Sequence, residues 1–182
     1  MREYILYTQS ERSINFQFLV VSIVFNIKIL ILTSFYLFVG QRAIGNGGNR
    51  SYSGHVRIYQ YINSSWQQLG TDIDGEAQLD QSGWSVSLSA DGSTVAIGAP
   101  YNDGNGSSSG HVRIYQYINS SWNQLGTDIE GEAEGDLSGI SVSLSADGST
   151  VAIGAPWNGG NGELSGHVHI YRFNGASWQQ LG

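Results

Sequence analysis

A repeat of 56 residues dominates this chain of 182 residues. Residues 54–109 and 110–165 are identical at 46 of 56 aligned positions, and residues 166–182 begin a third unit. Periods of this length are typical of propeller blades or solenoid units, in which each unit packs against its neighbour. The repeat therefore constrains the fold more than any local propensity does. One position of every unit is a tryptophan: Trp66, Trp122 and Trp178.

Short strands joined by tight turns are expected within each unit. Trp84–Ser89 alternates apolar with small polar residues, which is the pattern of a half-buried strand. Asp91-Gly92 follows, and both residue types tolerate the positive φ of a tight hairpin turn. Further strands are expected at Thr94–Gly98, at His55–Ile62 and around Trp66–Leu69, and no helical periodicity follows residue 40. Four antiparallel strands per unit predict an all-β fold of propeller blades. Because propellers close with about four to eight blades, these units predict an incomplete ring.

Composition and charge exclude several functional classes. Cysteine is absent, so the chain has no disulfide framework. The net charge is −7, and from residue 54 onward the basic residues are Arg57, Arg113 and Arg172. Nucleic-acid binding needs a basic surface, so we expect no nucleic-acid partner. Near-identical units argue against one unique catalytic centre, so a non-enzymatic protein is expected.

The N-terminal segment, residues 1–42, differs from the repeats. Leu19–Val39 is an apolar stretch of 21 residues, interrupted by Asn26 and Lys28, and it is long enough for a membrane-spanning helix. We favour an uncleaved signal-anchor helix, which would attach extracellular repeats to a membrane. A cleaved signal peptide with Ile29–Val39 as its core, which would release a secreted protein, remains an alternative. A buried hydrophobic segment and an error of gene prediction are the others.

Three motifs recur in register along the units. In the first occurrence they are Ser82-Gly83-Trp84, Val95–Pro100 and Gly110–Tyr115. Together they resemble the FG-GAP repeat, which is best known from the propeller of integrin α-subunits. The resemblance covers residues 43–182. It divides them into the remnant of an earlier repeat, two full repeats and a partial third: 43–53, 54–109, 110–165 and 166–182.

The resemblance implies a function in binding. FG-GAP propellers belong to secreted or cell-surface proteins, so the resemblance implies an extracellular recognition or adhesion protein with a protein or glycan ligand. Two alternatives are a structural surface-repeat protein without a defined ligand and a lectin-like carbohydrate-binding propeller. An incomplete ring leaves strand edges and apolar blade surface unprotected, which predicts either a longer protein or self-association.

The calcium-binding hairpin of integrin repeats is altered in this chain. That hairpin has the pattern Asp-x-Asp/Asn-x-Asp-Gly-x-x-Asp, whereas this sequence has Ser87, Ser89 and Asp91 at the first three positions. One carboxylate remains where calcium prefers several oxygen ligands. Asp91 and its equivalent Asp147 are therefore interpreted as turn residues.

A second acidic stretch is the better candidate for calcium. Its carboxylates alternate across a glycine and recur in the next unit, so each blade would present one such loop. The alternative is a solvated connecting loop, in which Asp80 and Asp136 accept hydrogen bonds from nearby backbone. The candidate ligands are Asp72, Asp74, Glu76, Asp80, Asp128, Glu130, Glu132 and Asp136.

Histidines and aromatic residues also recur. His55, His111 and His167 occupy equivalent strand positions, and we interpret them as strand-face residues because equivalent positions on successive blades lie far apart. The periodic tryptophans are expected to pack between sheets. Tyr101 and Trp157 lie in a Gly/Asn-rich loop, where an aromatic side chain can stack on a sugar or anchor a protein contact.

Four glycosylation sequons fall in expected turns or loops. They begin at Asn49, Asn63, Asn105 and Asn119. Attached glycans would place these segments on the surface of a secreted protein.

Overall fold

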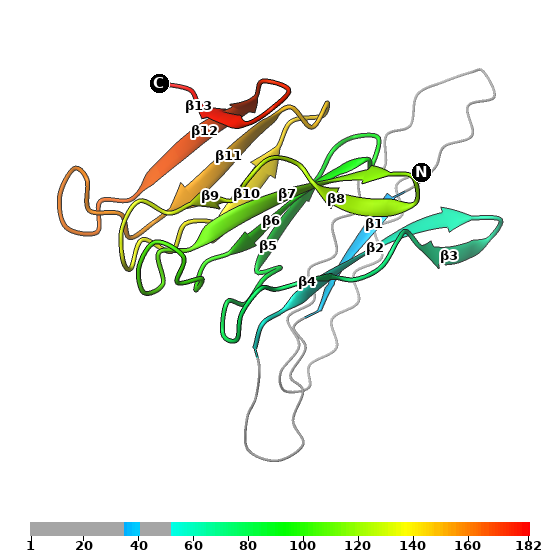
Figure 1. Ribbon diagram of the computed structural model, residues 1–182, viewed down its shortest axis with the longest axis horizontal. Coiled ribbons are helices and arrows are strands. Elements are labelled where there is room, and N and C mark those ends of the chain that lie inside the picture. Colours follow the sequence, from blue (N-terminus) through cyan, green and yellow to red (C-terminus); the bar gives the residue numbers. More distant parts are fainter. Residues whose placement is uncertain (1–34, 41–51) are drawn as a thin grey trace, which may run out of the picture.

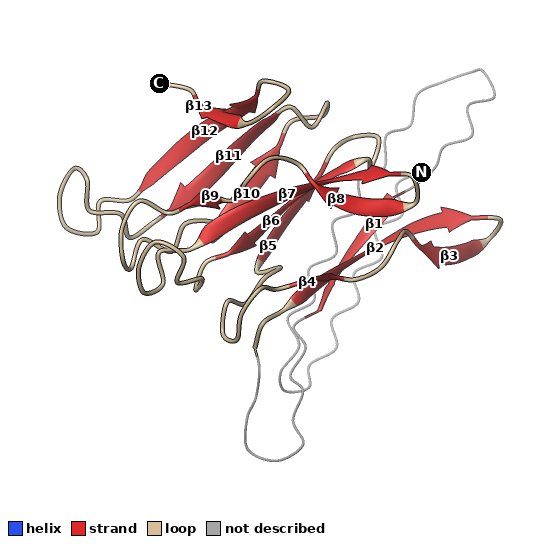
Figure 2. Cartoon of the chain, viewed as in Figure 1, coloured by secondary structure: helices blue, strands red, loops and turns tan. Residues whose placement is uncertain are grey.

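A computed structural model describes residues 35–40 and 52–182, and every regular element in these ranges is a β strand (Figures 1 and 2). The first sheet contains β1 (Phe35–Gly40), β2 (His55–Ile62), β3 (Ser65–Gln68) and β4 (Ile73–Asp74). The second contains β5 (Ser85–Leu88), β6 (Thr94–Ala99), β7 (His111–Ile118), β8 (Ser121–Gln124) and β9 (Ile129–Glu130). The third contains β10 (Ser141–Leu144), β11 (Thr150–Ala155), β12 (His167–Phe173) and β13 (Trp178–Gln180).

The strands of each sheet are antiparallel and follow chain order. The second sheet has the order β5-β6-β7-β8, and the two-residue strand β9 pairs with the start of β7. Its outer edge is therefore split between β8 and β9. The sequence analysis expected the strand that becomes β8 but not β9. The three sheets lie one beside the next (Figure 1). The expected all-β class is confirmed, and the repeated antiparallel sheets are consistent with propeller blades.

The second and third sheets each take strands from two successive sequence units. Strands β5 and β6 belong to residues 54–109, whereas β7, β8 and β9 belong to residues 110–165. The register is conserved between sheets: Ala99 pairs with His111 in the second sheet, and Ala155 pairs with His167 in the third. The sheets are therefore offset from the repeat units that were defined from the sequence.

Turn chemistry explains the hairpins. Asn63 and Ser64 connect β2 and β3, and both have positive φ values of 51° and 62°. Two such residues form the turn whose twist suits a two-residue hairpin. In the β5–β6 hairpin, Oδ1 of Asp91 accepts hydrogen bonds from the Ser89 hydroxyl at 2.7 Å and from the Ser93 amide at 3.0 Å. Asp91 thus closes the turn, as expected from the sequence.

The core lies between the faces of neighbouring sheets. Alternate residues of a strand point to opposite faces, so Val95 and Ile97 of β6 pack toward the first sheet while Ala96 packs toward the third. The first inter-sheet cluster contains Val56, Ile58, Ile73, Val95, Ile97 and Tyr115. The second contains Ala96, Val112, Ile114, Ile129, Leu144, Val151 and Ile153.

The second and third sheets approach most closely at their first strands. The Ser85 hydroxyl donates a hydrogen bond of 2.7 Å to the Gly139 carbonyl, and the Leu144 amide donates one of 2.9 Å to the Ser87 hydroxyl. Gly98 lies against this contact, where a Cβ atom would meet the Gly139 oxygen at 2.0 Å. The backbone approach therefore requires glycine at position 98.

The segment that was predicted to form an N-terminal helix ends in a β strand. Only this end of the segment lies within the described residues. Residues 19–34 of that helix lie outside the described residues, but Phe35–Gly40 forms β1 and pairs with β2, with Gly40 opposite His55. The expectation of a helix is wrong for this end. The physical reason is that one edge of β2 needs a hydrogen-bonding partner. In the second sheet, β6 pairs with the equivalent edge of β7. Residues 43–45, which belong to the expected remnant of an earlier repeat, lie outside the described residues. No helix in the described residues has the length and apolar character needed to cross a membrane.

Candidate functional site

Loops that are distant in the sequence meet at one end of the sheets. Strand β9 pairs with the start of β7, so the acidic loop after β9 lies beside the Gly/Asn-rich loop that precedes β7. The side-chain amide of Asn105 donates hydrogen bonds to the carbonyls of Gly131 at 2.8 Å and Glu132 at 3.1 Å. We call this end, formed by residues 75–84, 100–110, 131–140 and 156–166, the loop face; Figure 1 shows these loops on the same side of the sheets.

Asp80 and Asp136 lie inside the loop face and close the acidic loops. Each is 3% exposed. Oδ2 of Asp80 accepts a hydrogen bond of 2.9 Å from the Ala77 amide, and Oδ2 of Asp136 accepts one of 3.0 Å from the Ala133 amide. This confirms that both carboxylates bind nearby backbone.

An asparagine from the following loop reaches each of these buried carboxylates. The Asn102 side chain donates to Asp80 at 3.1 Å, and the Asn158 side chain donates to Asp136 at 2.8 Å. Because such bonds recur in both loops, the loop face is held in one arrangement by paired polar groups.

Asp72 forms an ion pair with Arg57 of the first sheet. Its carboxylate accepts two hydrogen bonds from the Arg57 guanidinium, at 2.9 and 2.7 Å. This bidentate contact lowers the pKa of Asp72 to about 2. Asp74 and Glu130 lie on the two-residue outer strands and are exposed. Partial desolvation of its carboxyl group, and then the Asp128 carboxylate, raise the pKa of Glu130.

A histidine of the second sheet faces two of the predicted acidic residues. Nδ1 of His111 lies 3.6 Å from Oδ2 of Asp128 and 3.9 Å from Oε2 of Glu76. His111 is 1% exposed, and this burial, with the nearby Arg113 charge, lowers its pKa. Nη1 of Arg113 lies 3.2 Å from Oε1 of Glu76, so the permanent positive charge of Arg113 already neutralises the Glu76 carboxylate.

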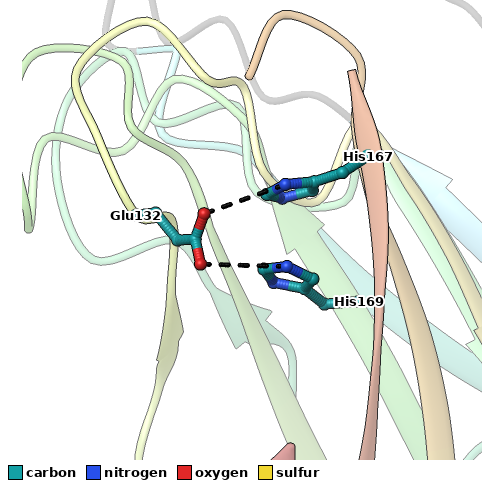
Figure 3. Close-up of side chains that lie close together, drawn as sticks. All are labelled: Glu132, His167 and His169. Carbon is teal, nitrogen blue, oxygen red and sulfur yellow. Dashed lines mark ion pairs between the residues drawn. The ribbon is translucent and has the colours of Figure 1, made fainter. Parts of the chain in front are cut away.

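The equivalent place in the third sheet carries a different set of side chains. His167 and His169 lie on β12, and Glu132 reaches them from the acidic loop after β9 (Figure 3). Oε2 of Glu132 lies 3.8 Å from Nδ1 of His167, and its Oε1 lies 3.8 Å from Nε2 of His169. The two imidazole rings are stacked with centroids 3.8 Å apart. The sequence analysis overlooked His169, although the change from His-Val-Arg to His-Val-His in the third unit was the available signal.

The eight predicted acidic ligands do not gather into one all-carboxylate centre per loop. In the described ranges, both clusters of three or more metal-ligand side chains contain histidine: Glu76 with His111 and Asp128, and Glu132 with His167 and His169. His55 is buried on β2 and belongs to neither cluster. Imidazole nitrogens favour transition metals rather than calcium.

The two predicted loop aromatics occupy different environments. Trp157 is 55% exposed on the loop between β11 and β12. Tyr101, its equivalent, is half-buried, and its ring meets that of Trp84 edge-on with centroids 5.8 Å apart. Trp157 is therefore the more accessible of the two for a ligand.

The sequons also differ in environment. Asn63 and Asn119 are exposed at the first position of equivalent hairpin turns. The Asn105 amide, in contrast, is engaged in the two hydrogen bonds of the loop face. Asn49 lies outside the described residues.

The repeated antiparallel sheets, packed face to face with their loops at one end, define an all-β repeat protein whose sheets are consistent with propeller blades. The sequence model of the FG-GAP repeat family matches residues 71–115 and 130–171. The chain therefore contains two FG-GAP repeats, which confirms the resemblance seen in its motifs. FG-GAP repeats are typically non-catalytic and suggest ligand-binding propeller repeats. No curated protein matches the chain closely enough to count as a relative.

Proposed function

We propose that this chain is a non-enzymatic recognition or adhesion protein of the cell surface or extracellular space, and that it binds a protein or glycan ligand through the loop face. The observation that carries this proposal is the internal fixation of the loops. Asn102 and Asn158 tie successive loops to buried carboxylates, so a ligand would meet an ordered surface. Binding to such a surface costs little ordering entropy.

The side chains of the loop face favour a ligand that has apolar groups and hydrogen-bond donors. Trp157 is exposed there, and Asp103, Glu134 and Glu163 add exposed carboxylates. A protein ligand with a basic rim, or a sugar that stacks on the indole, fits this surface. In this proposal the apolar segment that precedes β1 attaches the protein to a membrane, or a cleaved signal releases it.

Self-association is the second part of the proposal. Val112 is fully buried beneath the third sheet, whereas Val168, at the equivalent position of the third sheet, is 63% exposed. Ile170, which is equivalent to the buried Ile114, is exposed as well. This face continues the established packing between sheets, and a second copy of the chain, which offers the same patch, is the occupant that we propose for it.

Binding of the labelled chain to intact cells and to a glycan array tests the ligand-binding proposal. Trp157→Ala should reduce binding at least about tenfold, because exposed tryptophans often dominate binding energy. Trp66→Ala is the matched control, since Trp66 is 48% exposed but lies on β3, which pairs with the end of β2 far from the loop face. Protease treatment of the cells should abolish binding to a protein ligand, while binding on the array would favour the lectin alternative. Equal binding by both variants, or no binding by the wild type, would contradict the proposal.

A further inference from the structure

Two histidines and one glutamate converge between the second and third sheets. His167 and His169 are alternate residues of β12, so their side chains project from the same face of the strand. Glu132 comes from the loop after β9 in the neighbouring sheet, and its two oxygens face one ring each, both at 3.8 Å (Figure 3). One ligand atom from each side chain lies within 4.8 Å of the others.

This set of donor atoms suits a transition-metal ion. Two imidazoles and one carboxylate are a common ligand set for zinc and related divalent ions, which bind each donor at about 2.0–2.2 Å. Two donors of a tetrahedral zinc site are therefore about 3.3 Å apart. The two nitrogen–oxygen separations of 3.8 Å exceed this value by about 0.5 Å, and each of the three side chains has a ligand atom within 4.8 Å of the others, so small side-chain rotations are needed to bind an ion. Calcium, which takes six to eight oxygen ligands, does not suit two imidazoles.

In the preceding repeat, an arginine neutralises the equivalent glutamate. There Glu76, His111 and Arg113 correspond to Glu132, His167 and His169. The Arg113 guanidinium lies 3.2 Å from Glu76 and donates a hydrogen bond of 2.8 Å to the Asp74 carbonyl. Histidine at position 169 replaces this permanent cation with a nitrogen lone pair.

The carboxylate of Glu132 is also oriented by a neighbouring group. The side-chain amide of Asn158 donates a hydrogen bond of 3.2 Å to Oε2 of Glu132, and the same amide donates to the buried Asp136. Such support for a ligand is typical of metal sites, where partners beyond the ligands fix the donor geometry. The glutamate side chain remains half exposed, which leaves room for water in the remaining coordination positions.

From this geometry we propose that Glu132, His167 and His169 bind one divalent transition-metal ion of the zinc class. The ion takes the place that the Arg113 guanidinium has in the preceding repeat. Because the glutamate belongs to the second sheet and the histidines to the third, the ion also links the two sheets. The site does not depend on the proposed recognition function.

Zinc titration of the 182-residue chain tests this site. The chain is prepared without a histidine tag and freed of metal by a chelator, and binding is measured by calorimetry and thermal unfolding. One Zn²⁺ per chain is expected, with a rise in the unfolding temperature that Ca²⁺ does not produce. Co²⁺ should give the visible absorption of a low-symmetry site with nitrogen ligands.

Three variants separate the site from non-specific binding. His169→Arg copies the preceding repeat and can keep an ion pair with Glu132, so the fold should persist while zinc affinity falls at least tenfold. Glu132→Gln should weaken zinc binding similarly, whereas Glu134→Gln, which removes an exposed carboxylate two residues away, should bind like the wild type. A wild-type chain that binds no Zn²⁺, or undiminished binding by folded His169→Arg, would overturn the proposal.

Discussion

The indole Nε1 of Trp122 donates a hydrogen bond of 2.8 Å to the carbonyl of Leu69, which is 53 residues earlier in the chain. Trp178 makes the same bond to Leu125 at 2.7 Å. Each tryptophan also lies against an aromatic residue of its own sheet, with ring centroids of Trp122 and Tyr117 5.0 Å apart. Trp122 and Trp178 therefore each connect their own sheet to the preceding one, which is the packing role expected for them.

Replacement of this indole should destabilise the contact between sheets. Trp122→Phe keeps an aromatic ring but leaves the Leu69 carbonyl without this donor, so we expect a loss of about 0.5–1.5 kcal/mol in unfolding free energy. Trp178→Phe should show a similar loss. Chemical denaturation measures both, and Trp157→Phe, at an exposed site, serves as the control and should change stability by about 0.5 kcal/mol or less. Equal effects at all three positions would contradict a fastening role.

The close approach at Gly98 predicts intolerance to any side chain. Gly98→Ala would force a methyl group against the backbone oxygen of Gly139, so we expect a loss of about 1–3 kcal/mol or more. Gly154→Ala is the matched control at the same motif position. Its new methyl would meet the Ser141 hydroxyl, which can rotate away, and the loss should be smaller. Thermal unfolding of the two variants provides the comparison, and equal losses would argue against the close packing of the sheets.

The ion pair between Asp72 and Arg57 predicts an acid-dependent contribution to stability. The pKa of Asp72 is lowered in the folded chain to about 2 from an ordinary value of 3.8. Its contribution is therefore present above about pH 4 and disappears as the pH falls through 2. Asp72→Asn should cost about 0.5–1 kcal/mol at pH 7, since the pair is partly exposed to solvent.

Denaturation curves of wild type and Asp72→Asn at several pH values check this prediction. The two curves should converge near pH 2. A difference between wild type and Asp72→Asn that stays constant down to pH 2 would show that the ion pair is not its origin.

The environments of the sequons predict unequal glycosylation. In a eukaryotic secretory host, Asn63 and Asn119 should carry glycans because they are exposed in hairpin turns. Asn105 should be modified less, because a glycan on its amide would disrupt the two hydrogen bonds to the acidic loop. Peptide mass spectrometry with and without enzymatic deglycosylation measures the occupancy. A chain without glycans at Asn63 and Asn119 would count against passage through the secretory pathway.

The exposed face of the third sheet predicts self-association. Val168→Lys should shift the chain toward the monomer in sedimentation velocity, because a charged side chain cannot be buried between two copies without a partner. Ile118→Lys, which removes an exposed apolar residue at the end of β7, should associate like the wild type. Identical sedimentation of all three proteins would exclude this face as the interface between copies.

The repetitive part of the fold could be predicted from the sequence with some accuracy. The alternation around Val86 and the Asp91-Gly92 turn specify β5 and the hairpin that follows it. The short strands β4 and β9 were not expected, because two residues are too few to show any periodicity. Strand β1 was not expected either, since an apolar run suits a membrane helix and a buried strand equally well.

The candidate sites were less predictable than the fold. Asp80 and Asp136 could be interpreted correctly because their partners lie three residues away in the same loop. The partners of His167 and His169 could not be foreseen, because Glu132 lies more than 30 residues earlier and on a different sheet. Contacts of this kind depend on which faces of two sheets meet, and a single sequence does not encode that in any local pattern.

By itself, the sequence determined that a 56-residue unit recurs, that each unit is built of short strands and tight turns, and that its motifs resemble the FG-GAP repeat. These properties depend on local backbone preferences and on periodicity, which are written along the chain. The tertiary structure alone decided how the sheets are offset from the units, that Trp122 reaches back to Leu69, and that Glu132 meets two histidines. Each of these relationships arises from face-to-face packing of separate sheets, and the geometry of that packing exists only after the strands have assembled.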